Sequence, residues 1–130
     1  MLPGTTESVV IPAIETASGK KAGHDFLVCF NPEFLREGPA VADFFNPPFT
    51  VVGTNDPTQG APIAELYSYL EAPLYEIPTA AYAAAEMIKY SCNAFHALKI
   101  AFANEIGTIC SSLGLDPKIV ADVPRRRHER

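Results

Sequence analysis

The sequence predicts an α/β fold in which part of a parallel sheet is followed by one long helix. A strand–helix–strand order occupies residues 50–77, and this order favours parallel pairing of the two strands. No proline occurs between Pro78 and Pro117, a gap that favours one uninterrupted helix. The 130 residues and 48% hydrophobic content fit a globular domain, or a piece of one, better than a disordered chain.

The first thirty or so residues are predicted to form a helix and a strand. Apolar periodicity predicts a helix from Glu7 to Ala17, and the glycines of Ser18–Gly23 predict a loop after it. The short apolar run Asp25–Phe30 is typical of a strand, which the turn signal Asn31-Pro32 closes.

The middle of the chain supplies the strand–helix–strand order. Its prolines make Phe44–Phe49 a loop, and Thr50–Gly53 follows as a strand. Asp56 is predicted to cap a helix that has proline at its first position and ends near Leu70. Pro73–Ile77 is then the second strand.

The last third is dominated by the long helix. Thr79 to Leu113 is predicted to be one helix of about 50 Å, with Gly114 as its C-terminal stop. Asp116-Pro117 starts a further helix, which Pro124 and the arginines after it end.

Charge and cysteine content narrow the functional classes. The net charge of −5 gives no general attraction to nucleic acid, and the basic run Arg125–Arg127 is interpreted as a solvated end. The odd number and wide spacing of Cys29, Cys92 and Cys110 indicate neither a zinc site nor a disulfide framework. We therefore expect a cytoplasmic protein with no metal, targeting segment or membrane span.

The long helix has a polar stripe and an apolar side. At about 100° per residue, the stripe holds Lys89, Asn93, His96, Ile100 and Asn104. The opposite side is expected to face a core and collects Met87, Phe95, Leu98, Phe102, Ile106 and Ile109. A solvated face is the alternative interpretation of the stripe, although its composition suits a partly buried polar site better. A lysine and an asparagine one turn apart are able to donate to one ligand oxygen, as in an oxyanion hole.

An acidic loop, Asn31–Gly38, follows the first predicted strand. Ligands of α/β sheets bind beyond the carboxyl ends of strands, so this is a candidate site. Glu33 and Glu37, with Arg36 between them, are suited to acid/base chemistry and ligand contact. The alternative is a short helical turn that carries a pair of surface glutamates.

Two strings resemble the UDP-glucose/GDP-mannose dehydrogenase family, whose members are nucleotide-sugar 6-dehydrogenases. Residues 31–38, N-P-E-F-L-R-E-G, resemble its signature loop, and residues 86–105, E-M-I-K-Y-S-C-N-A-F-H-A-L-K-I-A-F-A-N-E, resemble its central helix. The initial L-P-G-T-T and the loop Asn46-Pro47-Pro48 before T-V-V-G fit as well. The resemblance covers nearly all of residues 2–122 in the family's order.

The resemblance implies a Rossmann domain for NAD, a central helical domain that dimerises, and a C-terminal domain for the nucleotide sugar. It also implies oxidation of the sugar C6 hydroxyl to a carboxylate in two NAD-dependent steps through a thioester. Residues 1–78 are then expected to be the C-terminal part of the NAD-binding domain, and 79–123 the start of the helical domain. Residues 124–130 are expected to be a basic tail foreign to the family.

The resemblance also implies roles for single residues. Glu33 matches the acid/base of thioester hydrolysis, and Glu37 matches a glutamate between the sugar and the nicotinamide. Lys89 and Asn93 match the pair that stabilises the oxyanion and an ordered water. The other substrate-binding positions that it implies are Phe34, Leu35, Arg36, His96 and Asn104.

Besides the tail, the chain departs from the family pattern at the cofactor loop and at the nucleophile. It contains no Gly-x-Gly string for a dinucleotide, and no Gly-Gly-Ser-Cys segment with the family's nucleophile; Cys92 is interpreted as a packing residue. We therefore expect an internal enzyme fragment that is inactive by itself. The alternatives are a catalytically dead binding or dimerisation module, and a small domain of unrelated function. His96 and the Asn104-Glu105 pair favour GDP-mannose over UDP-glucose as substrate.

Overall fold

A computed structural model describes residues 1–77 and 81–121. They form two compact units, Met1–Ser91 and Cys92–Arg130, and the long helix runs from the first unit into the second. The expected helix start at Thr79 and the tail of residues 124–130 lie outside the described residues. Within the described part, no helix combines the length and apolar character needed to cross a membrane.

The first unit begins with a helical segment close to its predicted position. One turn of π-helix, η1 (Thr6–Val10), continues into α1 (Ile11–Ser18). Gly19 then ends α1 in the left-handed conformation, with φ 69°, which glycine adopts without a steric penalty.

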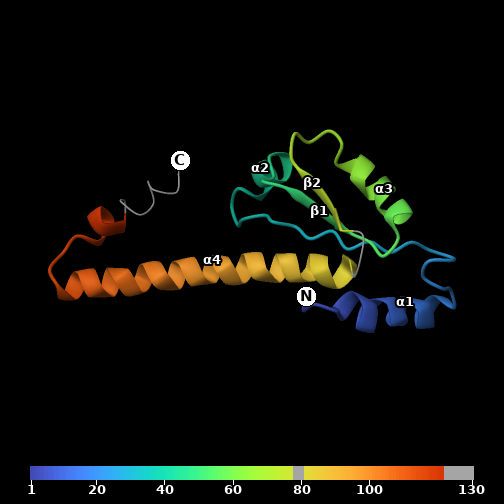
Figure 1. The fold of residues 1–130 in the computed structure, drawn as a ribbon, viewed down its shortest axis with the longest axis horizontal. Coiled ribbons are helices and arrows are strands. Elements are labelled where there is room, and N and C mark those ends of the chain that lie inside the picture. Colours follow the sequence, from blue (N-terminus) through green and yellow to red (C-terminus); the bar gives the residue numbers. More distant parts are fainter. Residues whose placement is uncertain (78–80, 122–130) are drawn as a thin grey trace. The chain divides into compact units, whose positions relative to one another are not determined.

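A two-stranded parallel sheet lies at the centre of the first unit. The strands β1 (Thr50–Gly53) and β2 (Leu74–Ile77) pair in parallel, from Thr50 opposite Leu74 to Gly53 opposite Ile77. Helix α3 (Pro57–Leu66) connects them and packs against both, as Figure 1 shows. Every residue of β1 is buried, as in an internal strand, whereas β2 is largely exposed.

Three predicted boundaries in this unit are wrong. The segment Asp25–Phe30 is not a strand: Phe30 forms an antiparallel bridge to Gly53, and Phe26 forms an isolated parallel bridge to Ala22. The Asp25 carboxylate instead accepts the backbone N–H of Lys21, and such local hydrogen bonds compete with a sheet ladder. The predicted loop Phe44–Phe49 is shorter than expected, because Phe44 and Phe45 are the last two residues of helix α2 (Ala40–Phe45).

The third boundary is the end of α3. The helix ends at Leu66 rather than near Leu70, and three-residue turns follow, such as the bond from the Tyr67 N–H to the Ala64 carbonyl. Such tighter turns are common where an α-helix ends.

Helix α4 (Ala81–Ser112) confirms the prediction of one long helix. Gly114, with φ 67°, ends it, and the Leu115 N–H bonds back to the Cys110 carbonyl as in a Schellman motif. A helical turn over residues 117–121 follows, with the Asp116 carboxylate accepting the Lys118 N–H at 2.9 Å.

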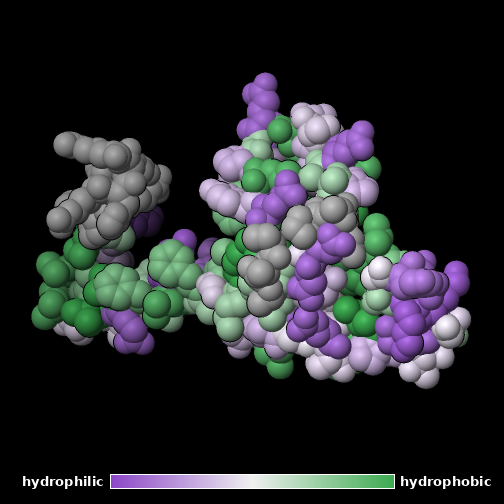
Figure 2. Space-filling model, turned by 45° about the vertical axis from the view of Figure 1, so that its right-hand side comes forward, coloured by the Kyte–Doolittle hydropathy of each residue, from purple (hydrophilic) through white to green (hydrophobic). Residues whose placement is uncertain are grey.

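The apolar side of α4 is not a core face within this chain. Phe95, Leu98 and Phe102 are each more than 60% exposed among the described residues. Figure 2 shows hydrophobic residues, in green, gathered over the C-terminal end of α4. The buried core lies in the first unit instead, and includes Val51, Val52, Ala81, Tyr82 and Ala85.

Candidate active site

The acidic loop leaves the sheet directly after the bridge between Phe30 and Gly53. Residues 31–36 have no regular secondary structure, and a turn covers residues 37–39. The loop is therefore not the helical turn that the alternative interpretation required. Gly38 has φ 91°, a conformation that favours glycine at this turn.

The loop and the long helix meet through Glu33 and Lys89. The Lys89 ammonium donates to the backbone carbonyl of Glu33 and, at 3.0 Å, to its carboxylate Oε1. The lysine side chain is 22% exposed and the glutamate side chain 60% exposed, so the ion pair lies at the surface. Two residues 56 positions apart are thus joined at one point.

The Glu33 carboxylate is held in its ionised form. The Leu35 backbone N–H donates to Oε2 at 2.7 Å, and this bond lowers the pKa of Glu33 below its usual value. The hydrogen bond from Lys89 lowers the same pKa further. Glu33 is therefore ionised and accepts hydrogen bonds at neutral pH.

Aromatic rings flank the lysine. The Lys89 ammonium lies 5.4 Å from the centre of the Phe34 ring, within the range of a cation–π interaction. Phe34 in turn makes an edge contact with Phe49, at 4.7 Å between ring centres. The Phe34 ring therefore covers one side of the ammonium group.

Arg36 is bound to a residue of α2. Its Nε and Nη2 atoms donate to the two oxygens of Asp43 at 2.9 and 2.7 Å, and its backbone N–H donates to Oδ2 at 3.0 Å. These bonds lower the pKa of Asp43 to about 2. The edge of the Arg36 guanidinium that carries Nε and Nη2 is therefore already bonded to Asp43.

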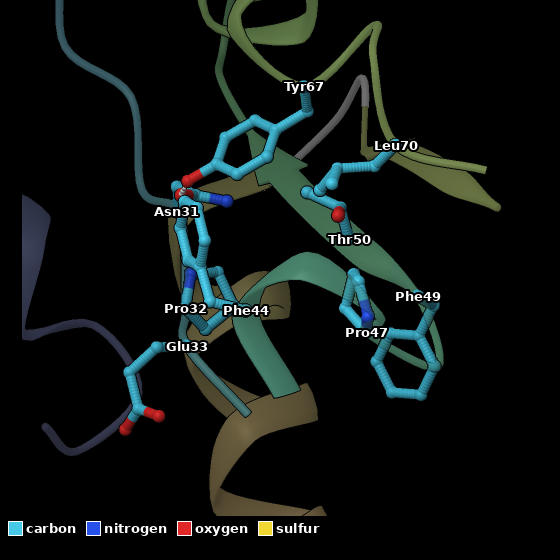
Figure 3. A pocket seen from close by; sticks show the side chains of 9 residues that line it. All are labelled: Asn31, Pro32, Glu33, Phe44, Pro47, Phe49, Thr50, Tyr67 and Leu70. Atoms are coloured by element: carbon cyan, nitrogen blue, oxygen red, sulfur yellow. Dashed lines mark hydrogen bonds between the residues drawn. The ribbon is translucent and has the colours of Figure 1, made fainter. Parts of the chain in front are cut away.

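A small cavity lies beside the acidic loop. Nine residues line its space of about 70 Å³, which is too small for a nucleotide sugar, since ligand pockets are usually ~300–1,000 Å³. Figure 3 shows the Tyr67 hydroxyl directed at Asn31, while the Glu33 carboxylate points away from the cluster of rings. Glu33 is thus one of the residues that line the cavity, but its carboxylate points out of the cluster of rings.

The start of α4 is fixed by polar contacts that place Lys89. The Glu86 carboxylate, which is 0% exposed, accepts the backbone N–H groups of Gly4 and Thr6 and the Thr6 hydroxyl. The Tyr82 hydroxyl donates to the Val28 carbonyl at 3.1 Å. Contacts with Gly4, Thr6 and Val28 therefore hold the first turns of α4 in place.

The other predicted site residues are not brought together within the first unit. Asn93, His96 and Asn104 belong to the second unit, where their side chains are exposed and make no hydrogen bond to a described residue. Leu35 and Glu37 are exposed on the acidic loop. The structure thus joins Glu33, Phe34 and Lys89, binds Arg36 to Asp43, and leaves the remaining predicted positions exposed.

Sequence reasoning missed four residues that shape the site, namely Asn31, Asp43, Tyr67 and Glu86. Asp43 and Tyr67 lie in no recognisable motif. Asn31 and Glu86 had a signal, because Asn31 is the first residue of the signature loop and Glu86 stands one turn before Lys89 in the helix motif.

The described residues do not form a complete dinucleotide site by themselves. The sequence has no Gly-x-Gly string. Backbone N–H groups at the start of a helix are of the kind that bind phosphate. Here the N–H groups of Gly4, just before η1, and of Thr6, its first residue, already donate to the Glu86 carboxylate. Because these two N–H groups already bind a buried carboxylate, they are not available to a phosphate group.

Comparison with known protein families identifies the family to which the chain belongs. The family model for the NAD-binding domain of the UDP-glucose/GDP-mannose dehydrogenase family matches residues 1–71, and the model for its central domain matches residues 83–129. The chain belongs to this family, whose N-terminal domain uses NAD. The predicted family is confirmed.

Known relatives fall into two groups by the names they carry. The chain is 51% identical over 123 residues to a GDP-mannose 6-dehydrogenase of Pseudomonas putida, a match that covers 95% of this chain. It is 42% identical to a UDP-glucose 6-dehydrogenase of Haloferax volcanii over 89% of the chain. It spans only 27% of the length of either relative.

Solved structures confirm the predicted fold class. The chain resembles the GDP-mannose dehydrogenase of Pseudomonas aeruginosa, solved as a ternary complex, with a TM-score of 0.92 and 50% identity. That match covers 100% of this chain and 29% of the other. A UDP-glucose dehydrogenase from Pyrobaculum islandicum gives a TM-score of 0.85 at 40% identity, over 95% of this chain and 27% of the other. The chain is thus part of a Rossmann-like α/β domain followed by the family's long helix.

Proposed function

We propose that this chain supplies part of the active site of an NAD-dependent nucleotide-sugar 6-dehydrogenase, which oxidises a sugar C6 hydroxyl to a carboxylate. The contact between Glu33 and Lys89 carries the proposal, because it joins the two family motifs at one point. The membership of the chain in the dehydrogenase family supports the same activity.

Lys89 is the proposed oxyanion donor. An ammonium group has three N–H donors, and two of them go to Glu33, so one remains for a substrate oxygen. The Phe34 ring shields one side of this group, and a donor that is shielded from water stabilises developing negative charge more strongly. Asn93, one helical turn further along α4, is the proposed second donor.

Glu33 is the proposed base in thioester hydrolysis. Its lowered pKa keeps the carboxylate ionised at neutral pH, which is the form that accepts a proton from water. Its position in an exposed loop leaves room for a water molecule beside it. Substrate contacts are proposed for Phe34, Leu35, Arg36, Glu37, His96 and Asn104, and a contact with the nicotinamide for Glu37.

GDP-mannose is the proposed substrate. Relatives named GDP-mannose 6-dehydrogenase are 50–51% identical to this chain, whereas those named UDP-glucose 6-dehydrogenase are 42% and 40% identical. We also propose a cytoplasmic homodimer and a domain boundary near residue 78, which falls between the two family-model matches.

A chimera tests the activity. Residues 1–123 replace the matching segment of the Pseudomonas putida enzyme, and NADH formation is measured with GDP-mannose and with UDP-glucose. We expect activity with a higher kcat/KM for GDP-mannose. Lys89→Ala in the chimera is expected to lower kcat by a factor of about 10² to 10³, the range for one lost oxyanion donor. Glu33→Gln is expected to leave a covalent intermediate that mass spectrometry detects.

The matched control is Lys99→Ala. Lys99 lies on the same helix, 4.9 Å from the Phe95 ring, and has no contact with Glu33. The Lys99→Ala substitution should therefore leave kcat unchanged. A folded chimera without activity would favour a dead binding or dimerisation module, and unchanged rates in Lys89→Ala would refute the donor role.

A further inference from the structure

Asn31 is held from two sides at the start of the acidic loop. Its Nδ2 atom donates to the Val51 carbonyl in β1 at 2.7 Å. Its Oδ1 atom accepts the Tyr67 hydroxyl, also at 2.7 Å. Figure 3 shows this hydroxyl reaching Asn31 across the cavity. The loop is therefore tied both to the buried strand and to the segment that follows α3.

The anchoring of Asn31 is transmitted to Glu33 through Pro32. Pro32 is buried, and its ring fixes its own φ angle near −65°. A proline also restricts the residue before it to extended conformations. Few backbone rotations thus remain between the Asn31 side chain and the Glu33 backbone carbonyl, which accepts a hydrogen bond from Lys89.

Tyr67 is directed at Asn31 by its surroundings. The chain tightens into three-residue turns after α3, and the Tyr67 ring lies 6.5 Å from the ring of Phe44. Its ring also lines the cavity. Tyr69, two residues further on, is 58% exposed and makes no side-chain hydrogen bond to a described residue. The contact is thus a feature of Tyr67 and not of tyrosines in this segment generally.

We infer that Tyr67 is a positioning residue for the active site: through Asn31 and Pro32 it sets the place of Glu33 against Lys89. The inference rests on the proposed function, which gives the Glu33–Lys89 contact its catalytic meaning. Tyr67 itself acts only through Asn31.

Zero-length cross-linking measures the Glu33–Lys89 contact directly. A water-soluble carbodiimide joins a carboxylate to an amine with which it is in contact, and mass spectrometry of the digested protein then gives the rate of each product. The pair Lys21–Glu15, at 2.9 Å in the same unit, serves as an internal reference. The full 130-residue chain is used at low micromolar concentration, and the monomer band is analysed.

Tyr67→Phe removes one hydroxyl and should lower the Glu33–Lys89 rate about two- to fivefold relative to the reference pair, the effect of one neutral hydrogen bond. Asn31→Ala removes the hydrogen bonds to both Val51 and Tyr67, and should lower the Glu33–Lys89 cross-linking rate further. Tyr69→Phe is the matched control and should leave the ratio unchanged.

The outcomes separate the inference from the function on which it rests. If the wild-type chain forms the Lys21–Glu15 product and no Glu33–Lys89 product, the pair behind the proposed function is overturned. If the wild-type chain forms both and Tyr67→Phe leaves their ratio unchanged, only the positioning role is overturned. A variant that loses both products together also contradicts it, because a general loss of structure is not a local positioning effect.

Discussion

Charged side chains in the first unit are fixed mainly by backbone N–H groups. Glu33 accepts one from Leu35, and Asp43 accepts one from Arg36 in addition to the guanidinium. A hydrogen bond to an ionised carboxylate is stronger than one between neutral groups. The acidic loop is therefore held by a bond within itself, from Leu35 to Glu33, and by bonds to Asp43 of α2 and Lys89 of α4.

The first prediction concerns the pKa of Asp43. The hydrogen bonds from Arg36 lower this pKa to about 2, so the pair stabilises the loop fully above about pH 4. That contribution is lost as the pH falls through about 2. We expect Arg36→Gln to raise the pKa of Asp43 toward about 3.9, as measured by NMR titration of the carboxyl carbon.

Asp25 is the internal control for this titration. Its pKa is lowered by the Lys21 backbone N–H and by His24, and it has no contact with Arg36. Its titration should be the same in both proteins. An unchanged pKa of Asp43 in the variant would show that Arg36 does not hold this carboxylate.

The second prediction concerns Glu86. Burial raises the pKa of this carboxyl, but its hydrogen bonds from Thr6 and Gly4 outweigh burial, so the pKa is lowered. Glu86→Gln places an amide against these donors and should reduce the free energy of unfolding by about 1 to 3 kcal/mol at neutral pH. Urea denaturation measures this difference.

The effect of Glu86→Gln should depend on pH. A lowered pKa contributes stability that is present above about pH 4.3 and is lost as the pH falls through the folded-state value. The two proteins should therefore converge in acid. Glu65→Gln, an exposed residue of α3, is the matched control and should be neutral. A constant difference at all pH values would contradict the assigned charge.

At the scale of elements, α4 approaches β1 closely at Gly53. A Cβ atom at Gly53 would lie 2.4 Å from the Ala81 carbonyl oxygen and 2.7 Å from the Ala85 Cβ atom. Only glycine permits this approach, and small alanines face it from the helix. The close packing holds the first turns of α4, and with them Lys89, against the sheet.

The third prediction follows from this contact. Gly53→Ala should destabilise the first unit by about 1 to 3 kcal/mol, because the backbone of α4 has to move away. Gly107→Ala is the matched control, since no atom lies within 4 Å of its added Cβ atom. That change should stabilise α4 by about 0.5 to 1 kcal/mol. Thermal unfolding distinguishes the two, and equal effects would contradict the close approach.

At the scale of the whole molecule, the second unit exposes a large apolar surface. Phe95, Leu98, Phe102 and Leu113 are each more than 60% exposed. Contiguous exposed apolar surface promotes association in water. The fourth prediction is therefore self-association of the chain, measured as a concentration-dependent sedimentation coefficient at tens of micromolar.

Two substitutions test the source of this association. Phe102→Lys places a charge on the apolar side of α4 and should weaken association. Ser111→Lys adds the same charge at an exposed polar residue of the same helix and should have little effect. A wild-type chain that sediments as a single monomer would contradict the prediction.

The fold class, the strand Thr50–Gly53 and the single long helix were all predictable from the sequence. These features depend on local periodicity, proline spacing and caps, which the chain carries residue by residue. Two motifs of 8 and 20 residues also identified the family, and Glu33 and Lys89 as candidates within it.

Only the tertiary structure decided which of these candidates meet. The predicted strand Asp25–Phe30 failed because a strand needs a partner along its length, and within this segment only Phe26 and Phe30 form isolated bridges. The Glu33–Lys89 contact spans 56 residues, and no local pattern encodes that distance. Tyr67 and Asp43 were missed for the same reason, since a single tyrosine or aspartate acquires its role only from the neighbours that folding brings to it.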